Sequence, residues 1–172
     1  AVHHYPFEHY ARWRAELGVL PVLAAPGAFG ENLSSAGLDE SGVCLGDRYA
    51  LGSVVLEVSQ GRQPCWKLND RFGVRDMARR VQDTGRTGWY YRVLQPGVAE
   101  AGDALQLLER PCPDWPLQRL TRLLADRVLD PARLREALAL PLVASWRKLV
   151  ERRLQWSQVE DWSRRIEGPD RA

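Results

Sequence analysis

Residues 59–68 form the stretch of this chain that is best suited to chemistry. They follow an alternating apolar run at 54–58, which predicts a strand entering the core. Pro64 fits the first position of a helix, so Cys65 is expected in the opening turn of that helix. Unpaired N–H groups and the positive end of the helix dipole stabilise an anion there. The pattern therefore predicts a cysteine that favours its thiolate form.

The surroundings of Cys65 favour the thiolate as well, because the cations Arg62 and Lys67 flank it. A small buried cysteine in a strand-to-helix corner is the alternative interpretation. Cys44 and Cys112 lack such surroundings and are interpreted as ordinary thiols. Three cysteines without a close pair argue against a disulfide scaffold, and they are too few for an iron–sulfur cluster.

Three motifs, taken in order, resemble those of the MOSC domain family: Phe29–Leu33, the Cys65 segment and Thr84–Val93. Within that family the chain is most similar to the bacterial YiiM group, and the similarity runs from His3 to about Trp162. The resemblance implies a molybdenum cofactor, molybdopterin with its metal, and reduction of N-hydroxylated compounds such as 6-N-hydroxylaminopurine. Such a reaction detoxifies base analogues. A separate flavoprotein reductase is expected to donate the electrons, because the chain has no GxGxxG nucleotide motif.

The same resemblance implies that Cys65 is the catalytic residue and the ligand of the molybdenum, since a soft metal prefers a thiolate. The phosphate of the pterin needs N–H groups, hydroxyls and arginine forks as donors. Two walls are predicted to supply them: Ser59, Gln60, Gly61, Arg62 and Lys67 form the first, and Thr84, Gly85, Arg86 and Thr87 form the second. Asn32 is expected to point its amide at the cofactor. A helix C-cap with a solvated arginine is the alternative for the second wall, and a polar hairpin residue is the alternative for Asn32.

The elements that must position these residues are short. Helices are predicted over about 5–17, 64–72 and 74–83, and strands over 87–94 and 105–109. Many short strands with interspersed helices suggest a small β-barrel. We therefore expect a mixed α/β, mainly β fold: a MOSC-type β-barrel with surrounding helices and a small C-terminal three-helix domain.

A domain boundary is predicted at 111–116, where three prolines occur in six residues. Beyond it the apolar period becomes helical, and Asp130 caps a helix that has Pro131 at its first position. This divides the chain into a MOSC domain at 1–110 and a three-helix domain at 111–172. Members of the family carry several dozen residues before the His-His-Tyr segment, so the first barrel strands are expected to be missing from the sequence given.

The composition of the chain excludes few classes of function. The chain has 172 residues, 45% of them hydrophobic and 27% charged, which is ordinary for a globular protein. A net charge of +2 predicts no stable nucleic-acid complex, and the absence of a run of about 18 apolar residues predicts no membrane span. The odd number of cysteines favours a reducing, cytoplasmic location.

Several alternatives stay open. His3 and His4 are interpreted as surface or capping groups rather than site residues. The basic residues of the last helix, including Arg164 and Arg165, are interpreted as a solvated face or as a docking surface for an electron donor. A non-catalytic module that binds or transfers the cofactor, or carries sulfur on Cys65, is the second candidate function. A metal-free base-binding protein is the third, suggested by the aromatic residues Trp66, Trp89, Tyr90 and Tyr91.

Overall fold

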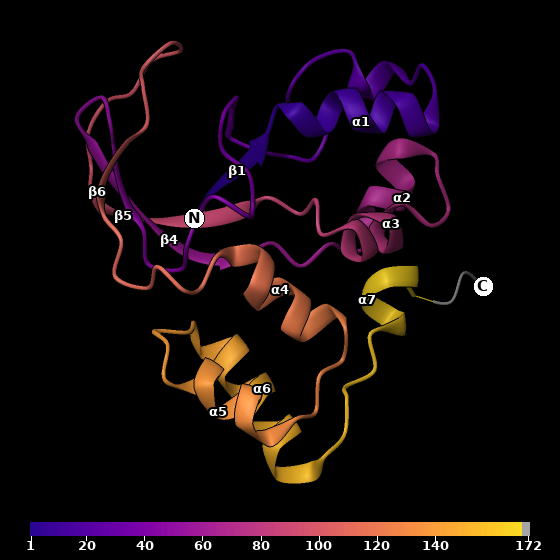
Figure 1. The fold of residues 1–172 in the computed structure, drawn as a ribbon. Helices are drawn as coiled ribbons and strands as arrows, with labels where there is room; N and C mark the ends of the chain where they lie inside the picture. The colour runs from indigo at the N-terminus through magenta and orange to yellow at the C-terminus, as the bar shows by residue number, and fades with distance from the viewer. Residues whose placement is uncertain (170–172) are drawn as a thin grey trace.

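A curled sheet of six strands, a half-barrel, is the scaffold within residues 1–169, which are the residues that this computed structural model describes (Figure 1). In spatial order the strands are β2-β1-β5-β4-β3-β6. Their bounds are Val2–Pro6 (β1), Leu33–Ser35 (β2), Arg48–Leu51 (β3), Val54–Gly61 (β4), Trp89–Gln95 (β5) and Gln106–Glu109 (β6). The strands predicted at 54–58, 87–94 and 105–109 are confirmed as β4, β5 and β6.

Register within the sheet brings the ends of β4 and β5 together. β1 runs parallel to β2 and antiparallel to β5, and β4 pairs antiparallel with both β5 and β3. Gly61 at the end of β4 lies opposite Trp89 at the start of β5, so the two segments that were predicted to form a site leave the sheet side by side.

Seven α-helices and one 3-10 helix, Pro21–Leu23, surround the sheet within the described residues (Figure 1). The α-helices are Glu8–Leu17 (α1), Lys67–Phe72 (α2), Met77–Thr84 (α3), Leu117–Ala125 (α4), Pro131–Leu138 (α5), Ala144–Trp156 (α6) and Ser163–Glu167 (α7). The carboxylate of Asp130 accepts a hydrogen bond from the backbone N–H of Arg133, which confirms the predicted helix cap. The mixed α/β fold with a C-terminal helical region is therefore confirmed.

Three predicted helix starts are wrong, and among them the helix predicted from residue 74 begins at Met77. The first helix begins at Glu8 rather than near residue 5, because residues 2–6 pair with β5 and β2 as a strand. The second helix begins at Lys67 rather than at Pro64, and Trp66 is its N-cap. The differences at the first and second helices have tertiary causes: strand partners distant in sequence take the backbone hydrogen bonds of β1, and before α2 the backbone N–H of Trp66 donates to the carbonyl oxygen of Arg165.

Two apolar cores hold the fold together. The first joins the sheet to the C-terminal helices through buried residues such as Leu56, Tyr91, Leu120 and Trp146. The second lies among α1, α2, α3 and α7, and Ile166 of α7 belongs to it. The chain therefore returns from α6 to the helices that flank Cys65 (Figure 1), and both cores contain residues from each side of residue 111.

Candidate functional site

Cys65 is a half-buried free thiol on the connection between β4 and α2. Its carbonyl oxygen accepts a hydrogen bond of 2.9 Å from the backbone N–H of Leu68. Because α2 begins only at Lys67, the cysteine precedes this helix and does not lie in its first turn. The predicted place of Cys65 in the opening turn of a helix is therefore wrong.

One cation near Cys65 comes from the far end of the chain. The guanidinium of Arg165, in α7, donates to the carbonyl oxygen of Pro64 and, at 2.7 Å, to the side-chain oxygen of Gln82. Burial lowers the pKa of Arg165, while Cys65 and Glu160 act in the opposite direction, which places the cysteine within electrostatic reach of Arg165. No local pattern indicates this contact, and the sequence predicts a solvated face or a docking surface for Arg165.

Arg62 connects the two predicted walls. Its backbone N–H donates to the carbonyl oxygen of Gly88 at 3.0 Å, and its side chain lines one small cavity together with Thr87. The Nη1 atom of Arg62 is buried without a hydrogen-bond partner. No carboxylate among the described residues forms an ion pair with this guanidinium. Its positive charge is therefore available to an anion.

His3 lies close to Arg62 and is buried in β1, so its predicted place at the surface or at a helix cap is wrong. Burial, assisted by the charge of Arg62, lowers the pKa of His3 to about 4, against the opposing effect of the Gly30 and Thr87 carbonyls. The ring is therefore neutral near pH 7, and its Nε2 atom is buried without a partner among the described residues.

Asn32 holds the strand that carries His3. Its side-chain oxygen accepts a hydrogen bond of 2.8 Å from the backbone N–H of His3. The backbone N–H of Asn32 in turn donates to the carbonyl oxygen of His3 at 2.8 Å. The exposed Asn32 thus uses its amide oxygen to position β1. Its predicted contact with a cofactor stays a prediction.

The second wall uses much of its hydrogen-bonding capacity within the protein. The Thr84 hydroxyl donates to the carbonyl of Arg80 at 2.7 Å, and Gly85 ends α3 with a left-handed φ of 73°, as expected for a helix C-cap. Arg86 is not solvated: its guanidinium lies 3.6 Å from the Trp13 ring centre and makes two hydrogen bonds of 2.8 Å to Glu16. The predicted contact of Arg86 with the phosphate of a cofactor stays a prediction.

The remaining residues of the first wall are placed along the end of β4. The hydroxyl of Ser59 donates to the carbonyl of Tyr90 at 2.9 Å, Gln60 pairs with Tyr90, Gly61 is buried and Lys67 is exposed. Of these, Lys67 presents its charge to solvent rather than to an enclosed site.

A buried carboxylate that the sequence did not reveal, Glu40, fixes the loop before β5. Glu40 accepts a hydrogen bond of 2.7 Å from the backbone N–H of Gly88 and one of 2.8 Å from His9. Gly88 has a φ of 68°, and a Cβ there would lie 2.3 Å from the His4 carbonyl oxygen. A glycine is therefore required where this loop passes β1.

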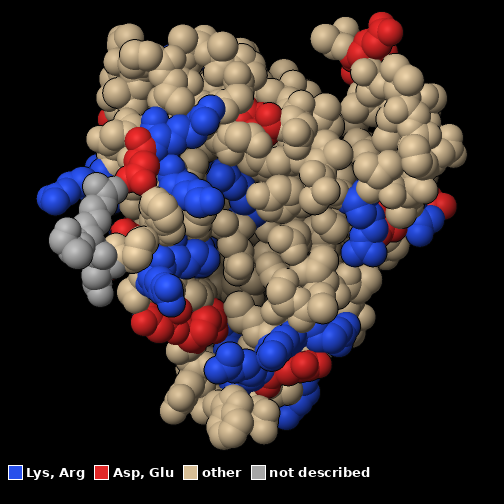
Figure 2. Space-filling model, turned by 180° about the vertical axis from the view of Figure 1, so that it is seen from behind, with Lys and Arg blue, Asp and Glu red and all other residues tan. Residues whose placement is uncertain are grey.

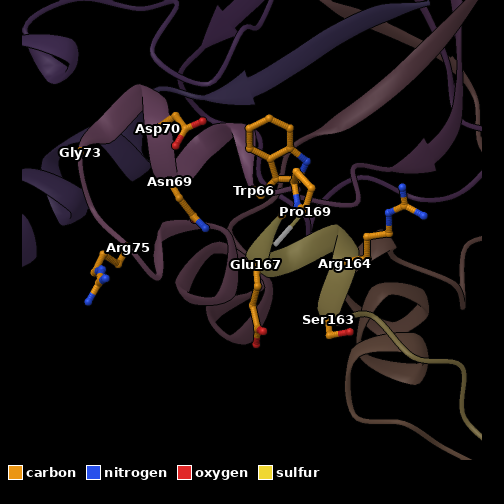
Figure 3. A pocket seen from close by; sticks show the side chains of 10 residues that line it. Trp66, Asn69, Asp70, Gly73, Arg75, Ser163, Arg164, Glu167 and Pro169 are labelled. Carbon is orange, nitrogen blue, oxygen red and sulfur yellow. The ribbon is translucent and has the colours of Figure 1, made fainter. Parts of the chain in front are cut away.

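A wide hollow of about 1280 Å³ opens beside the cysteine segment, between α2 and α7 (Figure 3). Trp66 forms one wall, and Arg75, Arg164 and Glu167 supply charged groups around it. Figure 3 shows the Trp66 ring beside Pro169, with Arg75 and Arg164 on different sides of the hollow. The hollow is large enough for a small organic molecule.

Two negative findings apply to residues 1–169. No group of three or more His, Cys, Asp or Glu side chains is arranged to hold a metal ion. No helix there combines the length and the apolar character that a bilayer span requires.

Comparison with known proteins identifies the family. Residues 1–106 match the MOSC domain, and residues 115–155 match the YiiM-like, 3-alpha helix domain. Protein YiiM of Escherichia coli (strain K12) is 38% identical over 169 residues, which are 98% of this chain and 75% of YiiM. A protein named "Reductase" from Gibberella moniliformis is 42% identical over 156 residues, which are 90% of this chain but only 28% of that protein.

Solved structures agree with these matches. The crystal structure of YiiM from Escherichia coli superimposes with a TM-score of 0.91 at 38% identity, covering 98% of this chain and 84% of that one. The crystal structure of YiiM from Geobacillus stearothermophilus gives a TM-score of 0.84 at 38% identity, covering 90% of this chain and 78% of that one. The chain therefore belongs to the MOSC domain family and carries the YiiM-like three-helix domain behind its curled sheet.

Proposed function

We propose that this chain is a molybdenum-cofactor-dependent reductase of N-hydroxylated compounds such as 6-N-hydroxylaminopurine. Membership of the MOSC family supports an association with the molybdenum cofactor, and the relative named "Reductase" supports reduction chemistry. The observation that carries the proposal is local. Cys65 is a half-buried thiol within electrostatic reach of the guanidinium of Arg165, and Arg62, three residues before it in the chain, has a guanidinium without an ion-pair partner among the described residues.

The residues present fit such a cofactor. Molybdopterin offers a soft metal and an anionic phosphate, which require a thiolate and cationic donors. Cys65 would hold the metal, and Arg62, with its buried unpartnered Nη1, would pair with negative charge on the cofactor. Asn32, Ser59, Gln60, Gly61, Lys67 and the residues Thr84–Thr87 remain proposed as further contacts.

When bound, the cofactor supplies a centre that exchanges two electrons with the substrate. Reduction of an N–OH group to an amine breaks the N–O bond, consumes two electrons and two protons, and releases water. Among the chain's own residues, His3 stays neutral because its pKa is about 4, so its unpartnered Nε2 offers a neutral ring nitrogen near the charge of Arg62. Trp66 offers an aromatic face at the hollow beside Cys65, on which a planar base can stack.

The electrons are proposed to come from a flavoprotein reductase in the cytoplasm. On the face seen in Figure 2, Lys and Arg side chains gather in several groups with acidic side chains among them. Such a mixed surface suits a transient encounter with the electron-donating protein, at a rate that depends on the salt concentration.

The test is reconstitution of the chain with molybdenum cofactor, followed by metal analysis and an assay of N-hydroxylaminopurine reduction with a chemical reductant. Molybdenum retention together with amine formation is expected. Retention without turnover on any N-hydroxylated substrate would favour the cofactor-binding or transfer function instead. Base binding by metal-free protein would favour the third function, although Trp89 and Tyr91 are fully buried and only Trp66 and Tyr90 of the four aromatic residues are partly exposed.

A further inference from the structure

The helices α2, α3 and α7 form one face of the molecule beside the segment that carries Cys65 (Figure 1). Trp66 directly precedes α2, and its backbone N–H donates to the carbonyl oxygen of Arg165 in α7 at 2.8 Å. All three helices contribute buried residues to the second apolar core, so they are held together as one surface. Residues 67–84 and 163–167 are named the α2–α7 face.

The net positive charge of the protein is concentrated on the α2–α7 face. Four acidic residues lie there: Asp70, Asp76, Asp83 and Glu167. Seven basic residues accompany them: Lys67, Arg71, Arg75, Arg79, Arg80, Arg164 and Arg165. Seven minus four leaves an excess of three positive charges, whereas the whole chain has a net charge of +2. The rest of the chain is therefore slightly acidic, and an acidic partner is attracted to this face rather than to the molecule as a whole.

Three exposed cations of this face have no carboxylate partner among the described residues. Two of the acidic residues are already engaged, because ion pairs join Arg79 to Glu167 at 2.8 Å and Arg80 to Asp76 at 2.9 Å. No ion pair with a described carboxylate involves Lys67, Arg75 or Arg164. Their charge is therefore available to carboxylates of another protein.

The hollow between α2 and α7 makes this face concave. Arg75 and Arg164 belong to its lining, and Figure 3 shows them on different sides of the hollow. Trp66, the neighbour of Cys65 in the chain, belongs to the same lining. A protein that covers the face and contacts both arginines therefore also covers the residue next to Cys65.

We propose that the α2–α7 face is the docking surface for the electron donor, and that this donor is a flavoprotein with an acidic surface around its flavin. The choice of partner rests on the proposed reductase function. A two-electron-reduced flavin gives up two electrons and two protons and becomes oxidised flavin. These are the electrons and protons that an N–OH group consumes when its N–O bond breaks and an amine and water form.

A polyanion such as a nucleic acid fits this face less well. Nucleic-acid binding depends on many contacts between cations and phosphates, whereas the excess of basic over acidic residues here is small. Interspersed acidic residues such as Glu167 would also repel a uniformly negative backbone. An acidic protein, in contrast, can place its own cations opposite them, which is the complementarity that transient protein complexes use.

The test measures binding to the cofactor-free full chain, so it needs no turnover. The probe is flavodoxin, a small acidic protein that carries FMN, and isothermal titration calorimetry measures its affinity. The affinity is expected to fall as the salt concentration rises from about 0.01 M to about 0.15 M, over which the Debye length falls from about 30 Å to about 8 Å. Absence of binding at the lower salt concentration, or an affinity that does not depend on salt, overturns the proposal.

Charge-reversal variants locate the docking surface. Arg75→Glu and Arg164→Glu change exposed residues of the α2–α7 face, and each is expected to weaken flavodoxin binding about tenfold at low salt. Arg152→Glu is the matched control, because Arg152 is an exposed arginine on α6, outside this face, and this variant should bind as the parent does. Equal weakening by all three variants, or by none, overturns the proposal. Arg75→Gln and Arg164→Gln take the place of a variant that circular dichroism shows to be unfolded.

Two further measurements distinguish the docking surface from other functions. A short oligothymidylate that binds more tightly than flavodoxin would assign the face to nucleic acid and overturn the proposal. In cofactor-loaded protein, the ratio of flavodoxin-driven to chemically driven turnover should fall in Arg75→Glu and Arg164→Glu but not in Arg152→Glu. Salt-dependent binding without any turnover by a chemical reductant would contradict the reductase function while supporting the docking surface.

Discussion

The backbone N–H of Trp66 donates to the carbonyl oxygen of Arg165 at 2.8 Å, so the segment that carries Cys65 is held by the last helix of the described chain. Asn69 adds a second tie, because its side-chain amide donates to the carbonyl oxygen of Ile166 at 3.0 Å. The C-terminal region is thus a structural part of the candidate site, and its removal would affect the cysteine segment directly.

Replacement of Cys65 by serine should abolish N-hydroxylaminopurine reduction and remove much of the bound molybdenum. A serine hydroxyl stays protonated near neutral pH, whereas a metal ligand must be deprotonated to bind well. Stability should change by only about 1 kcal/mol. Cys44→Ser and Cys112→Ser are the controls and should keep both activity and metal. A Cys65→Ser protein that is as active as the parent would show that the thiolate-ligand mechanism is wrong.

Truncation of Ile166 to alanine should destabilise the protein by about 2–4 kcal/mol, because this side chain is buried in the core that α7 shares with α2 and α3. Val159→Ala, at a partly buried position before α7, should cost less. Denaturant unfolding of both variants measures the difference. Equal costs would mean that α7 does not stabilise the cysteine segment through this core.

The buried guanidinium of Arg153 should be essential to the C-terminal helices. It donates to Glu160 at 2.7 Å and to the carbonyl oxygens of Leu123 and Leu124, and it is only 1% exposed. Arg153→Met should cost about 3–5 kcal/mol, since Glu160 and the carbonyls lose their partner. Arg152→Met changes an exposed neighbour and is the control. Thermal unfolding should separate the two variants by several degrees, and similar melting temperatures would contradict this assignment.

Stability should fall as the pH drops from about 6.5 toward 4, because two buried histidines resist protonation. Burial lowers the pKa of His3 and of His4 to about 4, from 6.5. Between these values the unfolded chain binds more protons than the folded chain, so acid favours unfolding. Each histidine contributes roughly 3 kcal/mol to this dependence.

The variant His4→Asn isolates half of the effect. His4 packs against Trp89, with 4.4 Å between ring centres, and bonds to the Tyr91 hydroxyl at 3.1 Å, so the variant should be less stable at pH 7. Its stability should nevertheless depend less on pH between 6.5 and 4 than that of the parent. An unchanged slope in urea unfolding across this range would show that His4 is not the titrating group.

Local patterns in the sequence determined much of this protein. Alternation at 54–58 predicted β4, the Asp130-Pro131 pair predicted the start of α5, and three ordered motifs predicted the family. These signals are local because a strand face, a helix cap and a family motif are each encoded within a few consecutive residues.

Only the tertiary structure decided how the candidate site is assembled. Pro64 marks a possible helix start, yet the helix begins at Lys67, where the preceding backbone is held by Arg165 from α7. The sequence around His3 and His4 favoured a helix start, but these residues lie in β1. The strands β2 and β5 pair with the backbone of β1, and both histidine rings are buried. One interpretation of Arg86 was a solvated cap, but Trp13 and Glu16 of α1 receive its guanidinium. In each case the deciding partner is far away in the sequence, and no local pattern records a hydrogen bond or an ion pair that forms only when distant segments pack together.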